Sequence, residues 1–271
     1  MSQPRVQPAE RGPEASQSAA TLSPVPGRAA ASSGPVRALA ARAMVHRAVR
    51  HPYLERLRSG DLPDPVAALR DFARHYRGYS YHFPRYLTAV MSRLAEPRHR
   101  EALLANLVEE SGRYDGAELR ELRAAGIDAA WVDGVPHPEL FRRLCVALGV
   151  EDGGAEEPEV ECWRDLFLGV LTHGSAAEAV GALGLGTEGI VREIYRPLLV
   201  AAQRAGVEPR DAAFLTLHTL VDDHHQASLL AIAEDLAGSP EGLRDLERGM
   251  NKALHLRAGF WDFLLQRALE A

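Results

Sequence analysis

Three residues in the last quarter of the chain, His218, Asp222 and His225, combine the side-chain types that bind iron or manganese. They lie four and then three residues apart in a segment with helical periodicity. At about 100° per residue, their side chains would share one stripe of a helix. Two imidazoles and a carboxylate suit Fe or Mn in an open, reactive site. A solvated polar patch is the alternative, but the apolar neighbours favour partial burial, which is costly unless an ion satisfies the polar groups.

Two glutamates and a histidine elsewhere could complete such a site, because three ligands on one helix rarely make a dinuclear centre. Glu110 follows two leucines at helical spacing and is therefore expected to face inward. Glu188 is predicted just inside a helix lined with Ile and Val, where the helix dipole alone also favours a carboxylate. His137 lies at a predicted helix start, where capping or solvent exposure is the ordinary role.

The bulk properties exclude several classes of protein. The formal net charge of −6 leaves no basic surface for nucleic acid. With only two cysteines, a disulfide framework is not expected and a reducing compartment fits best, and the same count argues against Cys-Cys-His zinc clusters. No apolar run reaches the roughly 18 residues that a membrane span needs, and the first residues lack the compact apolar core that marks a secretory signal. We therefore expect a cytoplasmic protein that binds neither nucleic acid nor membranes.

The composition changes near residue 35. Residues 1–35 are rich in Ala, Pro, Ser and Gly and carry too little apolar surface to offset their ordering entropy, which predicts a disordered leader. Residues 36–271 keep a helical periodicity without any convincing strand pattern. The predicted helices cover residues 36–58, 64–94, 97–110, 139–148, 160–173, 175–183, 188–205, 209–237 and 240–269. Pro52 and Pro84 should break or kink the first two. The expected fold is an all-α bundle of seven or more helices in one domain.

Several motifs together resemble the haem-oxygenase-like di-iron oxidases, an iron-containing redox enzyme family related in fold to thiaminase II and pyrroloquinoline-quinone synthase. The motifs are NLVEESG (Asn106–Gly112), HPELFRR (His137–Arg143), GTEGIV (Gly186–Val191), the His218-x3-Asp222-x2-His225 element and YHFPRYL (Tyr81–Leu87). The resemblance covers the chain from about Arg47 to its C-terminus. It implies a haem-oxygenase-like fold and six metal ligands, which are Glu110, His137, Glu188, His218, Asp222 and His225.

The resemblance also implies an O₂-activating non-haem di-iron oxidase or oxygenase. Six protein ligands shared by two irons leave coordination positions for O₂ and a substrate, and two Fe(II) ions can jointly supply electrons. Family members act on amino acids and fatty acids. The expected substrate is therefore an amino acid or related small metabolite, oxidised by N-oxygenation or by oxidative C–C or C–N cleavage in natural-product biosynthesis. An external reductant is expected between turnovers, and the long helices could supply a homodimer face.

One spacing departs from the family pattern, because a long insert, residues 113–136, separates Glu110 from His137. The family usually has a much shorter connection at this point. The insert is a candidate lid over the substrate. Asp115 or Glu118 within it is an alternative ligand to His137.

Tyr79, His82 and Arg85 lie around the kink expected at Pro84. At that position they could face the cavity and bind a substrate carboxylate. Packing or surface exposure is the alternative for all three.

Three other hypotheses compete with the di-iron centre. His46 and His51 lie on the first helix, where haem oxygenases of this architecture carry their axial ligand, but a haem site leaves the carboxylates unexplained. A metal-free enzyme of the thiaminase-II or quinone-cofactor-synthase type is the second. The third is a non-catalytic helical binding protein whose polar stripe forms an interface.

Overall fold

The computed structural model describes residues 34–151, 153, 156–220 and 223–270, and all regular secondary structure in these ranges is helical. The predicted all-α class is therefore confirmed. The predicted leader, residues 1–35, lies almost wholly outside the described residues, so its boundary stays a prediction. The helices are α1 (Pro35–Met44), α2 (Pro52–Ser59), α3 (Pro65–Ser80), α4 (Phe83–Arg93), α5 (Pro97–Glu110), α6 (Gly116–Ala124), α7 (Ala129–Val132), α8 (His137–Ala147), α9 (Pro158–His173), α10 (Ala176–Val180), the π-helical segment η1 (Gly181–Glu188), α11 (Gly189–Arg204), α12 (Ala213–Leu220), α13 (Asp223–Leu236) and α14 (Pro240–Glu270).

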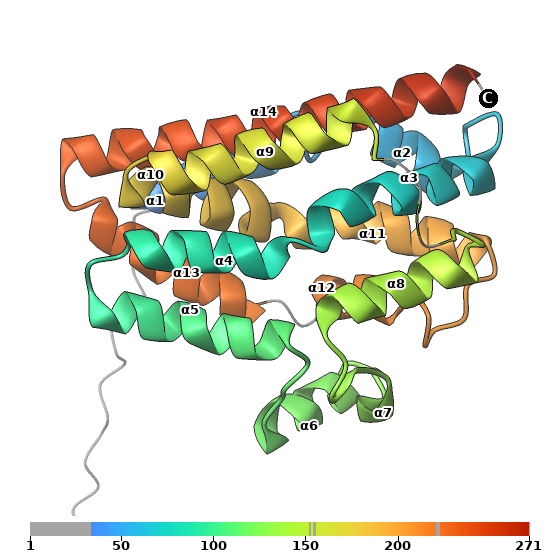
Figure 1. The fold of residues 1–271 in the computed structure, drawn as a ribbon, viewed down its shortest axis with the longest axis horizontal. Helices are drawn as coiled ribbons and strands as arrows, with labels where there is room; N and C mark the ends of the chain where they lie inside the picture. Colours follow the sequence, from blue (N-terminus) through green and yellow to red (C-terminus); the bar gives the residue numbers. More distant parts are fainter. Residues whose placement is uncertain (1–33, 152, 154–155, 221–222, 271) are drawn as a thin grey trace, which may run out of the picture. The chain divides into compact units, whose positions relative to one another are not determined.

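The helices within residues 34–270 pack in layers (Figure 1). The long α14 runs beside α9 and α10 and crosses η1. Helices α3 and α4 contact α9 on one side and α8 and α5, respectively, on the other. Helix α12 packs against α8 and α11. This arrangement brings the end of α5, the start of α8 and the end of α12 toward one place. In the described ranges, no helix combines the length and apolar character needed to cross a bilayer.

Both expected proline breaks occur. Helix α1 ends at Met44 and α2 begins at Pro52. Helix α3 ends at Ser80, and α4 begins at Phe83 with a proline in its first turn. Proline is tolerated there because the first amides of a helix have no intrahelical acceptor. The break after α3 leaves Tyr81 exposed, whereas Ser80 is buried.

Two helices that the sequence predicts as separate, residues 175–183 and 188–205, are joined by η1. Thr187 precedes the second of these predicted helices, where a threonine often caps a helix, but it does not do so here. Its hydroxyl instead donates a 3.1 Å hydrogen bond to the Ala182 carbonyl oxygen, five residues earlier. This spacing matches the π-helical register, which often occurs at functional sites. Glu188 is the last residue of the π-helical segment.

Glycines in this region serve helix packing rather than a turn. A Cβ atom added to Gly181 would lie 2.1 Å from the Leu246 carbonyl oxygen of α14. A Cβ atom on Gly249 of α14 would lie 1.9 Å from the Glu178 carbonyl oxygen of α10. The two backbones can approach this closely only because both positions are glycine. The contact with α14 therefore fixes the start of η1, the segment that ends at Glu188.

Candidate metal centre

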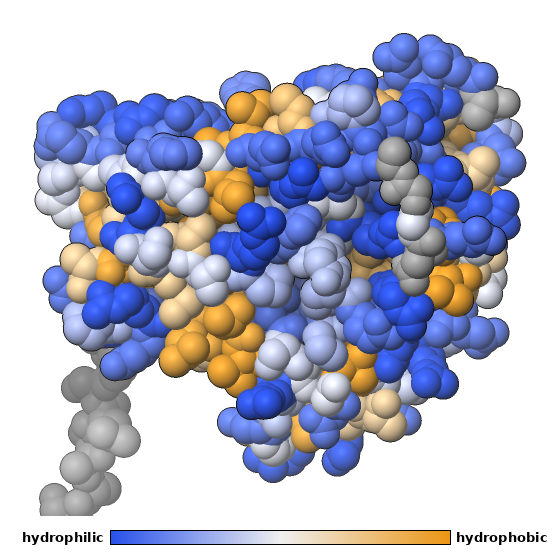
Figure 2. All heavy atoms as spheres, viewed as in Figure 1, coloured by the Kyte–Doolittle hydropathy of each residue, from blue (hydrophilic) through white to orange (hydrophobic). Residues whose placement is uncertain are grey.

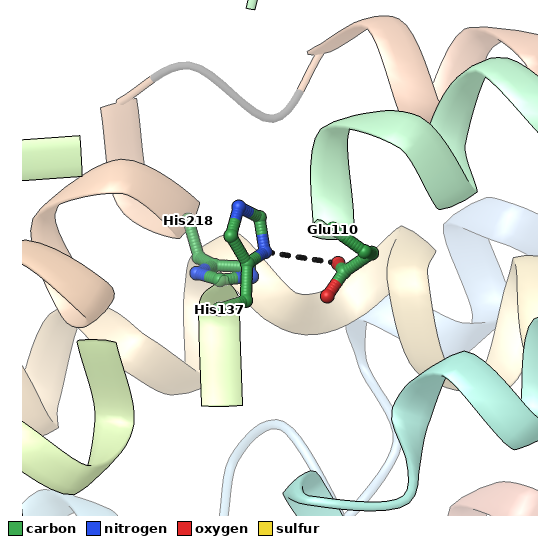
Figure 3. A group of neighbouring side chains, drawn as sticks. All are labelled: Glu110, His137 and His218. Atoms are coloured by element: carbon green, nitrogen blue, oxygen red, sulfur yellow. Dashed lines mark ion pairs between the residues drawn. The ribbon is translucent and has the colours of Figure 1, made fainter. Parts of the chain in front are cut away.

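Three of the predicted ligands, Glu110, His137 and His218, converge in the interior (Figure 3). They come from the last residue of α5, the first residue of α8 and the body of α12. One potential ligand atom from each residue lies within 4.8 Å of the other two. All three side chains are buried, with relative exposures of 4%, 3% and 8%. Residues 27 and then 81 positions apart in sequence thus form one compact donor set.

One nitrogen of each imidazole lies at hydrogen-bond distance from a group outside the Glu110–His137–His218 set. His218 Nδ1 donates a 2.7 Å hydrogen bond to the Phe214 carbonyl oxygen, so Nε2 is the nitrogen with a lone pair. His137 Nε2 lies 2.9 Å from the Tyr114 hydroxyl oxygen. His137 Nδ1 lies 3.0 Å from Glu110 Oε1, yet it makes no hydrogen bond within the described residues. Metal-binding histidines commonly fix the other ring nitrogen in this way.

These features fit a transition-metal ion. A buried carboxylate and two buried imidazoles are costly without a compensating charge or a complete set of hydrogen bonds. The His137 Nδ1 atom, buried beside a carboxylate oxygen without a hydrogen bond, is the position that a cation between the two would satisfy. Mixed imidazole and carboxylate donors suit iron, manganese or zinc.

The insert of residues 113–136 is closed at its base, which explains how Glu110 and His137 still meet. The Gly134 amide donates a 2.7 Å hydrogen bond to the Gly112 carbonyl oxygen. Gly112 has φ +79°, and a Cβ atom there would lie 2.4 Å from the Val135 carbonyl group. Glycine is therefore required at this position by both backbone conformation and space. The insert extends as a side loop carrying α6 and α7 (Figure 1).

The alternative ligands in the insert have another role. Asp115 accepts hydrogen bonds from the amides of Ala117 and Glu118, and the Glu118 carboxylate accepts one from the Asp115 amide. This reciprocal capping box begins α6. His137, in contrast, lies with Glu110 and His218. The geometry thus supports His137 over either acidic residue.

Tyr114 contacts the site and was not predicted to do so. Burial, followed by the nearby carboxylates of Glu109 and Glu110, raises the pKa of its hydroxyl. A neutral Tyr114 hydroxyl can accept a hydrogen bond from His137 Nε2 and leave Nδ1 as the ligand atom. No local sequence pattern predicts the contact between Tyr114 and His137, because it depends on the tertiary folding of the insert, residues 113–136.

We expect Tyr114→Phe to weaken Fe(II) binding by about 10–100-fold, the usual effect of removing the hydrogen-bond partner of a metal-binding histidine. The control is Tyr86→Phe, which removes a buried hydroxyl whose hydrogen bond goes to the Tyr79 carbonyl oxygen rather than to His137. Anaerobic Fe(II) titration of both variants and the wild type measures the effect. Equal loss of affinity in both variants would show that Tyr114 has no special role.

The three ligands and Glu188 line one cavity with largely aromatic walls. Its other lining residues are Tyr76, Tyr79, Ser80, Phe83, Pro138, Thr187, Val191, Tyr195 and Phe214. Glu188 is 7% exposed but is not part of the group whose ligand atoms lie within 4.8 Å of one another. Glu188 therefore lines the same cavity as Glu110, His137 and His218, but it is not a member of their cluster of potential ligand atoms.

A buried arginine supports the aromatic wall. The Arg257 guanidinium lies 3.4 Å from the Tyr76 hydroxyl, 3.3 Å from the Tyr79 hydroxyl and over the Trp163 ring. The Tyr76 and Tyr195 hydroxyls are 2.6 Å apart. These contacts hold the tyrosines in place and add a positive charge behind a cavity that contains two glutamates.

The remaining predicted site residues separate into three groups. Asp222 and the side chain of His225 lie outside the described residues, so their assignment as ligands stays a prediction. Tyr79 lines the buried cavity, whereas His82 and Arg85 line an open groove next to it. His51 is buried, but its Nδ1 accepts a hydrogen bond from the Tyr53 amide and its Nε2 contacts Asp262, which does not suit a haem ligand.

Comparison with known proteins decides the family. The sequence profile of a family described as iron-containing redox enzymes matches residues 70–258. This chain belongs to the iron-containing redox enzyme family. Membership confirms the resemblance inferred from the motifs and makes the protein an oxidoreductase. The candidate centre lies within the matched range.

Relatives of this iron-containing redox enzyme support the same fold. A 4-aminobenzoate synthase of Chlamydia muridarum is 26% identical over 232 residues, which cover 81% of this chain and 85% of that protein. The structure of a CADD-like protein from Nostoc punctiforme matches with a TM-score of 0.69 at 15% identity, over 87% of this chain and 97% of that one. A TenA homologue from Pseudomonas syringae matches with a TM-score of 0.64 at 18% identity, over 85% and 91%. A Shewanella denitrificans domain with a heme oxygenase-like fold gives 0.63 at 13% identity, over 86% and 89%. The predicted haem-oxygenase-like architecture is thereby confirmed.

Proposed function

We propose that the protein is an O₂-activating, non-haem di-iron oxidase or oxygenase acting on an amino acid or related small metabolite. The observation that carries the proposal is the buried Glu110–His137–His218 donor set, in which each histidine has one ring nitrogen at hydrogen-bond distance from a neighbouring group. Glu188 lines the same cavity and is assigned to the second iron, together with Asp222 and His225. The family match supports iron as the metal.

The chain's own residues would prepare the site for oxidation. When bound, ferrous iron supplies the electrons that reduce O₂. The Phe214 carbonyl oxygen and the Tyr114 hydroxyl hold the outer nitrogens of the two imidazoles, which keeps the inner nitrogens oriented. The aromatic wall excludes bulk water and protects reactive species from side reactions.

The substrate class is inferred from the cavity and from one relative. The chlamydial relative is a 4-aminobenzoate synthase, and its product carries an amine and a carboxylate on a small ring. For this chain we propose only that it oxidises a small molecule with an amine and a carboxylate. The reaction would be N-oxygenation or oxidative C–C or C–N cleavage. An external reductant between turnovers, a homodimer and a cytoplasmic location belong to the same proposal.

Anaerobic titration with Fe(II), followed by addition of O₂, tests the metal assignment. We expect two Fe(II) per chain and their rapid oxidation by O₂, measured by chelator assay and O₂ uptake. Protein loaded with redox-inert Zn(II) is the control and should consume no O₂. Iron binding well below one per chain, with no O₂-dependent oxidation, would favour a metal-free enzyme or a binding protein of the same fold.

A further inference from the structure

Side chains that are easily oxidised lie next to the candidate metal centre. Tyr76, Tyr79 and Tyr195 line its cavity. Tyr79 also stacks on Trp163 of α9, with ring centroids 4.0 Å apart and an angle of 1° between the ring planes. Phenol and indole rings give up a single electron more readily than the other ring side chains. A centre that activates O₂ would therefore oxidise its own wall, and the damage would spread from Tyr79 to Trp163 because the two rings are in contact.

These rings lie beneath the surface. All four are at most 4% exposed. The surface of α9 and α14, along the top of Figure 2, is mainly hydrophilic and has only small apolar patches. A dissolved reductant therefore cannot contact the rings, and their protection has to come from within the fold.

Arg257 of α14 places a buried positive charge over three of the rings. Its side chain is 1% exposed, and arginine stays protonated in proteins. The guanidinium carbon lies 5.8, 5.1 and 5.2 Å from the ring centroids of Tyr76, Tyr79 and Trp163. Among the residues that the structure describes, no carboxylate forms an ion pair with Arg257. Its neighbours are thus aromatic rings and not an acid.

Packing alone does not account for an arginine at this position. A buried charge is costly to desolvate, and apolar residues of similar volume are often at least as stable in its place. The hydrogen bonds from Arg257 to the hydroxyls of Tyr76 and Tyr79 are long, at 3.4 and 3.3 Å, and therefore contribute little. The charge itself is the feature that needs a function.

A positive charge beside a ring makes it harder to remove an electron from that ring. The neutral ring attracts the guanidinium, whereas a ring that has lost an electron is positive and is repelled by it. At about 5 Å and an effective dielectric constant of about 20, this repulsion disfavours the oxidised ring by on the order of 100-fold. A phenol avoids the repulsion only by releasing its hydroxyl proton, and the guanidinium cannot accept that proton because it has N–H donors alone.

We propose that Arg257 protects the aromatic wall of the cavity from oxidation at the O₂-activating centre. The step that it suppresses is transfer of one electron from Tyr76, Tyr79 or Trp163 to the oxidant at the centre, with release of the proton of the phenol. The electrons that reduce O₂ then come from the iron, the substrate and the external reductant. Arg257 touches no reacting atom and acts through the rings. The proposal rests on the proposed function, because it needs an oxidant in the cavity.

Peptide mass spectrometry of the full-length, iron-loaded protein after repeated exposure to O₂ tests this role. A ring that has lost an electron takes up oxygen from O₂ or water, so the mass of its peptide reports the damage. Arg257→Met and Arg257→Gln remove the charge, and we expect oxygen addition at Tyr79 and Trp163 to rise at least about 10-fold. Arg257→Lys keeps the charge and should stay close to the wild type. A role in packing alone would not separate the lysine variant from the glutamine variant by charge.

The matched control is Arg267→Met. It removes an arginine that lies over a ring on the same helix, 5.2 Å from the centroid of Phe263, a residue that does not line the cavity. Oxygen addition at Tyr79 and Trp163 should not change in this variant. Iron content and circular dichroism are measured for every variant, so that a loss of iron or of fold is not read as protection.

An arm without metal separates the role of Arg257 from the metal assignment. Azide radicals, produced by radiolysis, remove single electrons from tyrosine and tryptophan in the metal-free protein. Trp163 should be modified more in Arg257→Met than in the wild type, whereas the buried Trp261, which does not line the cavity, should be modified equally in both. Failure of the wild type to take up iron, with this contrast intact, would count against the di-iron centre and not against Arg257.

Three outcomes would overturn the protective role. One is equal oxygen addition in the wild type and Arg257→Met in both arms. Another is loss of protection in Arg257→Lys as complete as in Arg257→Met, since the charge would then not be the cause. The third needs no variant and holds even if the variants fail to fold: Trp163 in the iron-loaded wild type should gain no more oxygen than Trp261, and preferential oxidation of Trp163 would exclude protection.

Discussion

Replacement of Glu110 by glutamine is expected to remove iron from the position formed by Glu110, His137 and His218. The amide keeps the shape of the side chain but loses the charge and the strong donor oxygen that a divalent ion requires. Because Glu110 is 4% exposed, water has little room to replace the missing ligand. We expect Fe(II) affinity to fall by more than the ~10–100-fold that loss of an outer partner typically causes. O₂ consumption should fall with it.

Anaerobic titration with iron analysis measures this loss, and thermal unfolding gives a second readout. Iron that binds only the folded protein raises its melting temperature. The difference in melting temperature between iron-loaded and iron-free protein should therefore be smaller in Glu110→Gln than in the wild type. Glu101→Gln, the same change at an exposed position of α5, is the control and should keep both iron and this difference. Full iron content in Glu110→Gln would remove Glu110 from the ligand set.

Helical periodicity accounts for those parts of the site that lie within one helix. It places Glu110 on the buried side of α5, and it predicts burial near His218, as the structure shows. Periodicity says little about how helices meet. The contact between Glu110 and His137 depends on the hydrogen bond that closes the insert at Gly112, a tertiary feature without a local pattern. At a predicted helix start, His137 has an ordinary capping role as its alternative, and the resemblance of its neighbouring residues to the family is what favoured it as a ligand.

The unpredicted features share a physical cause. The glycine-rich segment before Glu188 looks like a helix break, because glycine disfavours helices. In the structure the crossing with α14 outweighs that preference and a π-helical segment forms. Ser80 lies at a helix end, where a serine ordinarily caps or contacts solvent, and its unpaired burial depends on the packing around the cavity. Tertiary packing decided each of these positions.

Glu188→Gln is expected to lower the iron content from two per chain toward one. Glu188 lines the cavity but lies outside the group of Glu110, His137 and His218. Loss of its charge should therefore weaken one metal position and leave the other bound. A single Fe(II) cannot supply the electrons that a pair supplies jointly, so O₂-dependent oxidation should fall by at least ~10–100-fold.

The matched control is Glu193→Gln on α11, which removes one partner of an exposed pair with Arg196. Both variants are compared by iron analysis after anaerobic loading and by the rate of Fe(II) oxidation after O₂ is added. Circular dichroism checks that η1 and α11 remain helical, since glutamine has the same length and shape as glutamate. Retention of two irons in Glu188→Gln would exclude Glu188 as a required ligand. Loss of both irons would instead show that both metal positions depend on Glu188.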